Sequence, residues 1–192
     1  MAIYSLVKIY QSERHGLKKC LDSLDNIDQI IVCDGRYPDS AWGTSDPKQL
    51  EYYRKRYPPG NESTDNSREI CKAYSNLTWL KPPSKGWTSE TEKMNYALKH
   101  VPDDNWVLLI DPDETLVGNI RSAVPPSQCD VVGMRVQDLE GHNLYYYRLF
   151  KKKLGMSFAT HHSLQFEHGS VVELYAGNSA DHCYILHNRV EV

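Results

Sequence analysis

The chain has 192 residues, 40% of them hydrophobic, and a formal net charge of -3. This length favours a single domain with a substantial core, and the absence of a long Lys/Arg run argues against a nucleic-acid partner. The five cysteines are scattered without a Cys-x-x-Cys pair, which favours buried free thiols over a zinc site or a disulfide framework.

The N-terminal residues predict a parallel strand–helix–strand unit. Residues 2–10 are apolar and β-prone, and apolar residues at helical spacing follow over residues 17–24. We expect a helix of about three turns there. Residues 29–33 form a second apolar run, which Asp34 and Gly35 end. Two strands joined through a helix by short connections form the right-handed parallel unit of α/β proteins.

The next stretch, residues 36–62, is rich in Pro and Gly and predicts a long loop that contains a helical turn over residues 49–56. A loop of this length inside a compact domain is usually functional or mobile. The basic cluster Arg54–Arg56 is expected to form a solvated face. Residues 63–65 then offer an N-cap for a helix over residues 66–74.

The middle of the chain predicts a strand, a helix and a central strand. A short apolar run over residues 77–80 predicts the first strand, and residues 89–92 have the Ser-x-x-Glu form of a capping box. That helix is expected to end near His100. Residues 106–110 are five successive apolar residues, which is typical of a strand buried on both faces. Pro112 cannot donate to a strand ladder, so this strand should end just before it.

After Val117 the pattern changes to short apolar runs separated by turn residues. The expected strands are residues 130–136, 143–151, 157–161, 170–175 and 183–187. We therefore expect a parallel first part and a mixed or antiparallel second part. The predicted fold class is α/β, with a Rossmann-like mixed sheet flanked by helices in a single domain.

Three carboxylates, Asp111, Asp113 and Glu114, follow the central strand. In open α/β sheets, ligands bind at the carboxyl end of the strands. Carboxylates this close repel one another unless a cation lies among them, and a carboxylate-bound Mg²⁺ commonly also binds substrate phosphates. The competing interpretations are a solvated Asp-Pro turn and, for Glu114, either a supporting role behind the site or a charge at a helix N-terminus. An EF-hand loop is excluded, because Leu116 and Ser122 occupy the positions that require Gly and Glu.

The order of these motifs resembles that of the family 2 glycosyltransferases with the GT-A fold. The opening VKIYQSERHGLKKCLDSLDNIDQIIVCDG is similar to the family's first strand, helix and second strand, and ESTDNSREICKAY to its Ser-Thr-Asp turn and following helix. EKMNYAL resembles the helix that carries Lys and Asn near the donor, and NWVLLIDPDE resembles the Asp-x-Asp motif. YRLFKKKLGMSFATHHSL is similar to a segment in which a basic, aromatic strand leads to a His-Glu pair. The long insertion after Asp34 departs from the minimal family pattern.

The resemblance implies a metal-dependent enzyme that moves a sugar from a nucleotide-diphosphate donor to an acceptor hydroxyl with inversion. Residues 1–115 would form the nucleotide-binding part of one GT-A domain, and residues 116–192 the acceptor side. The implied cation is Mn²⁺ or Mg²⁺, with Asp111, Asp113 and His187 as its ligands; carboxylate oxygens suit either ion, and imidazole tolerates Mn²⁺.

The same resemblance implies a set of donor-binding residues, namely Asp34, Asp65, Lys93, Asn95 and Asp111. Asp34 would accept a hydrogen bond from the base, and Lys93 would pair with phosphate. Three of these residues also have a structural interpretation. Asp34 fits an Asp-Gly turn, Asp65 fits a helix cap, and Lys93 fits an ordinary surface lysine. Residues 4–8 would line the base pocket from the end of the first strand.

The general base is expected at His162, where the family usually has a carboxylate, with Glu167 as the alternative. A neutral imidazole is a competent base near pH 7. His161 and Asp138 are further candidates for this role. The replacement of the carboxylate by His162 also leaves open a nucleotide-binding module without catalytic activity.

A phosphatase is a third interpretation. The run from Asp111 to Thr115 satisfies the Asp-x-Asp-x-Thr pattern of haloacid-dehalogenase-type phosphatases, in which the first Asp is a nucleophile. Such chains normally carry this motif near the N-terminus, whereas more than half of this chain precedes it.

The partners expected from the main interpretation are a nucleotide-diphosphate sugar and an acceptor that is a glycan, a lipid or a protein. The N-terminus lacks an apolar region of signal-peptide length, and no apolar run approaches the length of a membrane span. We therefore expect a cytoplasmic protein and leave peripheral attachment to a membrane open.

Overall fold

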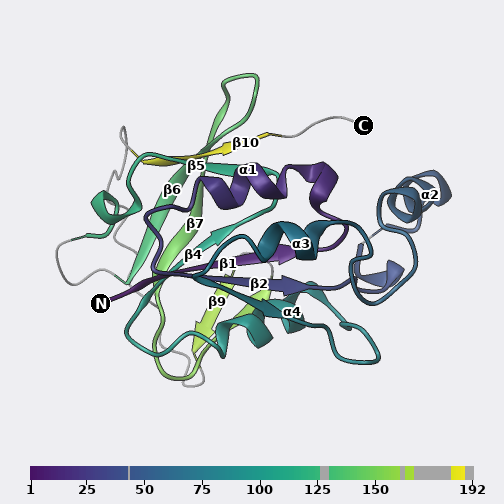
Figure 1. Cartoon of the computed structure of the whole chain (residues 1–192), viewed down its shortest axis with the longest axis horizontal. Coiled ribbons are helices and arrows are strands. Elements are labelled where there is room, and N and C mark those ends of the chain that lie inside the picture. Colours follow the sequence, from purple (N-terminus) through teal and green to yellow (C-terminus); the bar gives the residue numbers. More distant parts are fainter. Residues whose placement is uncertain (43, 126–129, 161–162, 167–182, 189–192) are drawn as a thin grey trace.

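The computed structural model describes residues 1–42, 44–125, 130–160, 163–166 and 183–188. Within these residues, eight strands form one mixed sheet in the order β3-β2-β1-β4-β7-β6-β10-β5, and two strands form a separate sheet, β8-β9. Helices lie on both faces of the large sheet (Figure 1). The prediction of a single-domain, mixed α/β fold is confirmed.

The parallel part of the sheet follows the sequence prediction closely. Its strands are β1 (Ile3–Ile9), β2 (Gln29–Asp34), β3 (Leu77–Leu80) and β4 (Trp106–Ile110). β2 and β4 flank β1, and β3 lies beyond β2, all in parallel. The carboxyl ends of these strands therefore meet at one edge of the sheet, where Ile9 pairs with Asp34 and Val7 with Ile110.

The second part of the sheet is mostly antiparallel, as predicted. Its strands are β5 (Glu114–Val117), β6 (Val131–Gln137), β7 (Asn143–Lys151) and β10 (Tyr184–His187), and the small sheet consists of β8 (Met156–Thr160) and β9 (Ser163–Phe166). β7 pairs with both β4 and β6, and β10 runs parallel to β6 and antiparallel to β5. β5 and β9 are too short to give an alternation pattern, and the sequence analysis missed both. The strand expected over residues 170–175 lies outside the described residues.

Helices α1 (Leu17–Asp22) and α3 (Ser67–Cys71) cover one face of the parallel strands, and α4 (Glu90–Leu98) covers the other (Figure 1). Short 3-10 turns lie at Glu13–His15, Asp39–Trp42 and Ile120–Ser122. α1 is shorter than the three turns expected, because turns replace the helix from Ser23 onward. In the described part of the chain, no helix has the length and apolar character needed to cross a bilayer.

The insertion after β2 contains a regular helix, α2 (Pro47–Arg56), where the sequence analysis expected only a helical turn. Pro47 occupies the first turn, and the Asp46 side chain accepts a hydrogen bond from the Lys48 backbone at 3.0 Å. Both features are typical of a helix start. None of its residues is fully buried, and it lies beyond the carboxyl ends of β1 and β2 (Figure 1).

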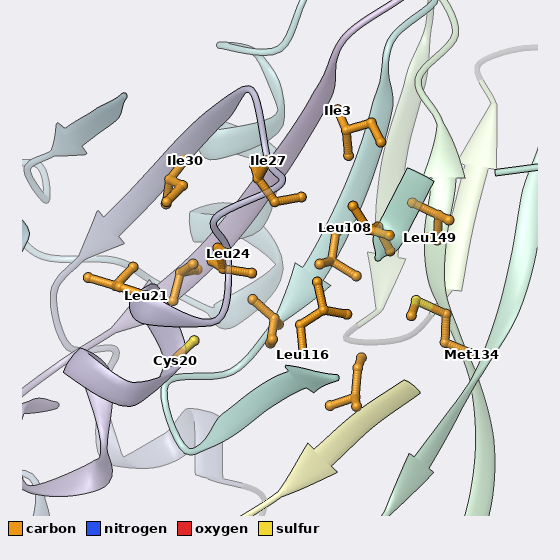
Figure 2. Packing of buried hydrophobic residues seen from close by; sticks show 14 of the residues in the cluster. Ile3, Cys20, Leu21, Leu24, Ile27, Ile30, Leu108, Leu116, Met134 and Leu149 are labelled. Carbon is orange, nitrogen blue, oxygen red and sulfur yellow. The ribbon is translucent and has the colours of Figure 1, made fainter. Parts of the chain in front are cut away.

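Alternation along β1 and β4 sends side chains into two cores. Ile3, Val7 and Ile9 of β1 and Leu108 of β4 belong to the same core as Leu17 and Leu21 of α1, and Figure 2 shows Ile3, Leu108 and Leu21 in it. Neighbouring positions such as Leu6, Val107 and Leu109 pack under α4. The described cysteines are buried free thiols, as expected: Cys20, Cys33, Cys71 and Cys183. The same alternation places Lys8 and Asp111, the next positions in step with Leu6 and Leu109, on the α4 face.

Candidate functional site

A pocket of about 530 Å³ lies at the carboxyl edge of the parallel strands. The ends of β1, β2, β4 and β10 line it together with α2 and the start of α4. Four residues predicted from the sequence line it: Lys93, Asp111, Asp113 and His187. The charged lining consists of four cations and three carboxylates: Lys8, Arg36, Arg56 and Lys93; Glu90, Asp111 and Asp113. The pocket is thus more positive than the chain as a whole, which carries a formal net charge of -3.

Five side chains of alternating charge run from the pocket toward the core, and we call them the charged row: Glu90, Lys8, Asp111, Arg148 and Glu114. Lys8 Nζ pairs with Glu90 and lies 3.1 Å from Asp111 Oδ1. Arg148 Nη2 lies 3.6 Å from Asp111 Oδ2 and 2.8 Å from Glu114 Oε1. Asp111 is therefore held between two cations. This arrangement fixes the orientation of its carboxylate.

Strand register explains why the charged row forms. β1 and β4 pair with Val7 opposite Ile110, so Lys8 and Asp111 are the next neighbours on the same face. Glu90 is the first residue of α4, which packs on that face, and Arg148 lies in step with the buried Phe150 of β7. The sequence analysis indicated Lys8 only as part of residues 4–8 and missed Glu90 and Arg148. The periodicity of a strand or helix could have indicated which face each residue occupies. It could not have indicated which charged residues of other elements lie beside it.

Glu114 supports the row from the buried end. Its side chain is only 2% exposed, and its Oε2 accepts the backbone N–H of Asp111 at 2.7 Å. Burial raises the pKa of Glu114, as does the nearby Asp111 carboxylate, whereas the Arg148 guanidinium lowers it. Glu114 begins strand β5, so its interpretation as a charge at a helix N-terminus is wrong.

Asp113 and His187 form a second acid–base pair at the edge of the pocket, with His187 Nε2 3.5 Å from Asp113 Oδ2. The pair forms because β10 lies antiparallel to β5, which puts His187 opposite Glu114. Asn188 extends the contact by donating its backbone N–H to the Asp113 carbonyl at 2.8 Å. The hydrogen bond to Asp113 raises the pKa of His187.

The three predicted metal ligands fit a divalent cation only in part. Asp113 and His187 place a carboxylate and an imidazole side by side, and both are suitable ligands for Mn²⁺. The carboxylate of Asp111 instead faces Lys8 and Arg148. Among the described residues, the ligand atoms of Asp111, Asp113 and His187 do not converge within 4.8 Å of one another.

Ligand atoms from three residues do converge elsewhere in the described chain, at the β6–β7 turn: Asp138, Glu140 and His142. Asp138 Oδ1 accepts the backbone N–H groups of Glu140 and His142 at 2.9 and 2.8 Å, and its Oδ2 lies 2.9 Å from His142 Nδ1. These bonds close the turn and account for the cluster without an ion. Asp138, a candidate general base, does not line the pocket described above.

Asp34 and Asp65 are not part of the pocket lining. Asp34 is completely buried, and its two carboxylate oxygens accept the Ser63 backbone N–H and hydroxyl at 2.9 and 2.6 Å. Burial raises the pKa of Asp34, although these hydrogen bonds oppose the effect. Asp65 accepts the backbone N–H groups of Glu13 and Ser67 at 2.9 and 3.1 Å. The N-cap of α3 is Asn66, so Asp65 lies one residue before the cap and bonds the first residue of the helix. Both residues fix the backbone that surrounds the pocket.

Lys93 lines the pocket but is not a surface lysine, because it is only 2% exposed. Its ammonium donates to the carbonyls of Ile9 and Gly35, both at 2.6 Å, and so ties the ends of β1 and β2 together. Burial lowers the pKa of Lys93 to about 8. Gly35 has a φ of 112°, and an added Cβ would lie 2.6 Å from the Pro82 Cβ, so no other residue fits there.

Asn95 lies away from the pocket and holds the small sheet. Its amide nitrogen donates to the Phe158 carbonyl at 3.0 Å, and its oxygen accepts the Phe158 N–H at 2.6 Å. The side chain therefore pairs with β8 as a neighbouring strand would. Asn95, expected among the donor-binding residues, does not line the pocket.

The pocket is also lined by four residues in mutual contact, which we call the α2 wall: Arg56, Tyr52, Tyr57 and His15. Arg56 donates to the hydroxyls of Tyr52 and Tyr57 at 2.9 and 3.2 Å, and its Nη2 lies 3.2 Å from His15 Nδ1. Burial lowers the pKa of His15 to about 4, and Arg56 adds to this effect. The sequence analysis missed the wall, although Tyr52 and Arg56 lie one helical turn apart.

The basic cluster at the end of α2 is thus only partly a solvated face. Arg54 and Lys55 are exposed, and they pair with Asp39 and Glu51 at 2.7 and 3.0 Å. Arg56 turns into the pocket instead, so the expectation is wrong for this residue.

His162 and Glu167, the predicted catalytic residues, lie outside the described part of the chain. Comparison with models of known protein families gave no match, and comparison with curated protein sequences gave none either.

Proposed function

We propose that this protein is a metal-dependent glycosyltransferase of the GT-A type, which transfers a sugar from a nucleotide diphosphate to an acceptor hydroxyl with inversion. The observation that carries the proposal is the position of the Asp111-Pro112-Asp113 motif. It lies at the carboxyl edge of parallel strands and lines a pocket with an excess of cations. This edge is the usual ligand site of such sheets, and the charge suits a diphosphate.

In this proposal, Asp113 and His187 hold a Mn²⁺ or Mg²⁺ ion, which would supply Lewis-acid stabilisation of the departing diphosphate when bound. Lys8 and Arg148 fix Asp111 as a carboxylate for the donor. Lys93 and Asp34 keep the ends of β1 and β2 in place, so the pocket is shaped before the donor binds.

The proton of the acceptor hydroxyl would be removed by His162 or Glu167. His162→Ala and Glu167→Gln are the variants to compare, with donor binding measured beside the transfer rate. Loss of a general base lowers the rate by about 10²- to 10⁴-fold and leaves donor affinity nearly unchanged. If neither variant changes the transfer rate, neither residue is the base, and Asp138 or His161 becomes the next choice.

A thermal-shift screen tests the proposal most directly. The full chain is heated with each nucleoside diphosphate, with and without Mn²⁺, and the nucleotide that stabilises it is then supplied as its sugar conjugates in a transfer assay. We expect metal-dependent stabilisation and release of the nucleoside diphosphate. Binding without turnover would support a nucleotide-binding module. Hydrolysis of a phosphate monoester with Asp111 trapped as a phosphoenzyme would support the phosphatase.

A further inference from the structure

Arg56 differs from Lys8 and Arg36, two other cations of the pocket, in what surrounds its charge, and it differs from the buried Lys93 in being partly exposed. Lys8 faces the carboxylates of the charged row, and Arg36 is paired with Asp39. The contacts of Arg56 in the described part of the chain are two tyrosine hydroxyls, the His15 ring and the Tyr57 ring, and none is a carboxylate. The Arg56 guanidinium is therefore held in one orientation at the surface of the pocket, and none of these contacts supplies a negative charge.

Two partners of Arg56, Tyr57 and His15, stay uncharged near neutral pH. Burial raises the pKa of the Tyr57 hydroxyl, although Arg56 opposes this effect, and burial together with Arg56 and Arg14 lowers the pKa of His15 to about 4. A guanidinium has one N–H on Nε and two on each terminal nitrogen. The contact with Tyr57 uses the Nε–H, and the contacts with Tyr52 and His15 each use one N–H of a terminal nitrogen, so each terminal nitrogen keeps one N–H. The remaining N–H groups share the plane of the fork that matches the oxygens of a phosphate.

We propose that Arg56 binds a phosphate group in this pocket and that this binding does not require a metal ion. Phosphate is favoured because the lining has four cations but only three carboxylates. A bound oxyanion would supply the negative charge that is missing beside Arg56. At about 530 Å³ the pocket is much larger than one phosphate, so the group belongs to a larger ligand. That ligand is either the diphosphate of the donor or a phosphorylated acceptor. The inference holds whether or not the chain transfers sugars.

Arg54 is a matched control for Arg56. It lies on the same helix two residues earlier, carries the same charge and is exposed, but it is paired with Asp39 and does not line the pocket. A general effect of net charge on anion binding would act on both residues. An effect of the oriented guanidinium would act on Arg56 alone.

The test is a calorimetric titration of the full chain with inorganic pyrophosphate in EDTA at low salt. Wild type is compared with Arg56→Gln, Arg56→Lys and Arg54→Gln, each first checked for an unchanged melting temperature. Because a hydrogen bond to a charged group is involved, Arg56→Gln should weaken binding by about 10- to 100-fold. Arg56→Lys keeps the charge without the fork and should fall between Arg56→Gln and wild type. Arg54→Gln should bind as wild type does.

Three outcomes would overturn the inference. One is the absence of pyrophosphate binding to wild type in EDTA, the second is equal binding by wild type and Arg56→Gln, and the third is an equal loss in Arg56→Gln and Arg54→Gln. A second titration, with nucleoside diphosphate after pyrophosphate has saturated the chain, identifies the source of the phosphate. Competition assigns the site to the donor, and simultaneous binding assigns it to an acceptor. Pyrophosphate binding through Arg56 without any sugar transfer would reject the proposed glycosyltransferase and leave this site standing.

Discussion

The charged row and the α2 wall line the same pocket, but they hold their charges in different ways. In the row, each cation lies between two carboxylates, and Glu114 and Arg148 are almost completely buried. In the wall, Arg56 is held by neutral hydroxyls and a neutral imidazole and remains partly exposed. The row compensates its charges internally, whereas the wall has a cation whose counter-charge must come from outside. The row is thus suited to maintain the structure, and the wall to bind a ligand.

This comparison predicts opposite results for substitutions in the two regions. A buried pair that loses one partner leaves an uncompensated charge inside the protein, which lowers stability strongly. A half-exposed guanidinium on neutral partners contributes little to stability and much to the affinity for an anion.

Arg148→Met should destabilise the protein by about 3–5 kcal/mol, because Glu114 would remain buried without its cation. Urea denaturation measures the loss. Arg121→Met is the control, because Arg121 pairs with Asp28 at a similar distance, 2.6 Å, but with 48% of its side chain exposed. That substitution should cost less than about 1 kcal/mol. Similar losses in both variants would mean that the row does not maintain the structure.

Asp113→Asn should abolish the metal-dependent gain in stability with nucleoside diphosphate and leave the unliganded fold intact. Asp113 contacts His187 and lies at the edge of the pocket, outside the charged row. The expected loss in donor affinity is about 2–4 kcal/mol, equivalent to one or two charge-assisted contacts. Asp111→Asn should also weaken donor binding but lower the unliganded stability as well, since Lys8 and Arg148 lose a shared partner. If Asp113→Asn binds metal and nucleotide like wild type, the metal assignment fails.

His15 makes the α2 wall sensitive to pH. The pKa of His15 is about 4 in the folded chain and ordinarily 6.5, so protonation favours the unfolded chain. The stabilising contribution is therefore present above pH 6.5 and lost as the pH falls toward 4. His15→Asn keeps an acceptor for Arg56 but does not titrate. Relative to this variant, wild type should lose about 1–2 kcal/mol over that interval, allowing for partial exposure. Parallel stability curves for the two proteins would show that His15 is not shifted.

The insertion over residues 36–62 should become more protected from hydrogen exchange when nucleotide and Mn²⁺ bind. α2 has no fully buried residue, and Tyr10 ties the segment to β1 through a hydrogen bond to the Pro58 carbonyl. A bound phosphate would add a contact at Arg56 and slow local opening by about tenfold, or 1.4 kcal/mol. β4, which is completely buried, serves as the internal control. Unchanged exchange in this insertion at saturation would mean that the insertion does not become more ordered when nucleotide and Mn²⁺ bind.

Local sequence patterns determined most of the parallel part of the fold. Apolar runs over residues 3–9, 29–34 and 106–110 are sufficient to specify buried strands, because each run is long enough to show its own pattern. Ser89 caps α4 by accepting the Glu92 backbone N–H at 3.1 Å, as its capping-box spacing predicts. From these elements, the edge that carries Asp111 and Asp113 follows from the sequence alone.

Contacts between distant segments decided the rest. Lys93 is buried because the carbonyls of Ile9 and Gly35 accept its ammonium, 84 and 58 residues away in the sequence. His187 reaches Asp113 only because β10 pairs with β5, a strand of four residues that has no stability without that partner. The sequence does not distinguish Arg56 from the exposed Arg54. In the folded chain, Arg56 contacts Tyr57 and His15. Periodicity determines which face of an element a residue occupies, but strand register and the packing of α2 determine which charge meets which partner.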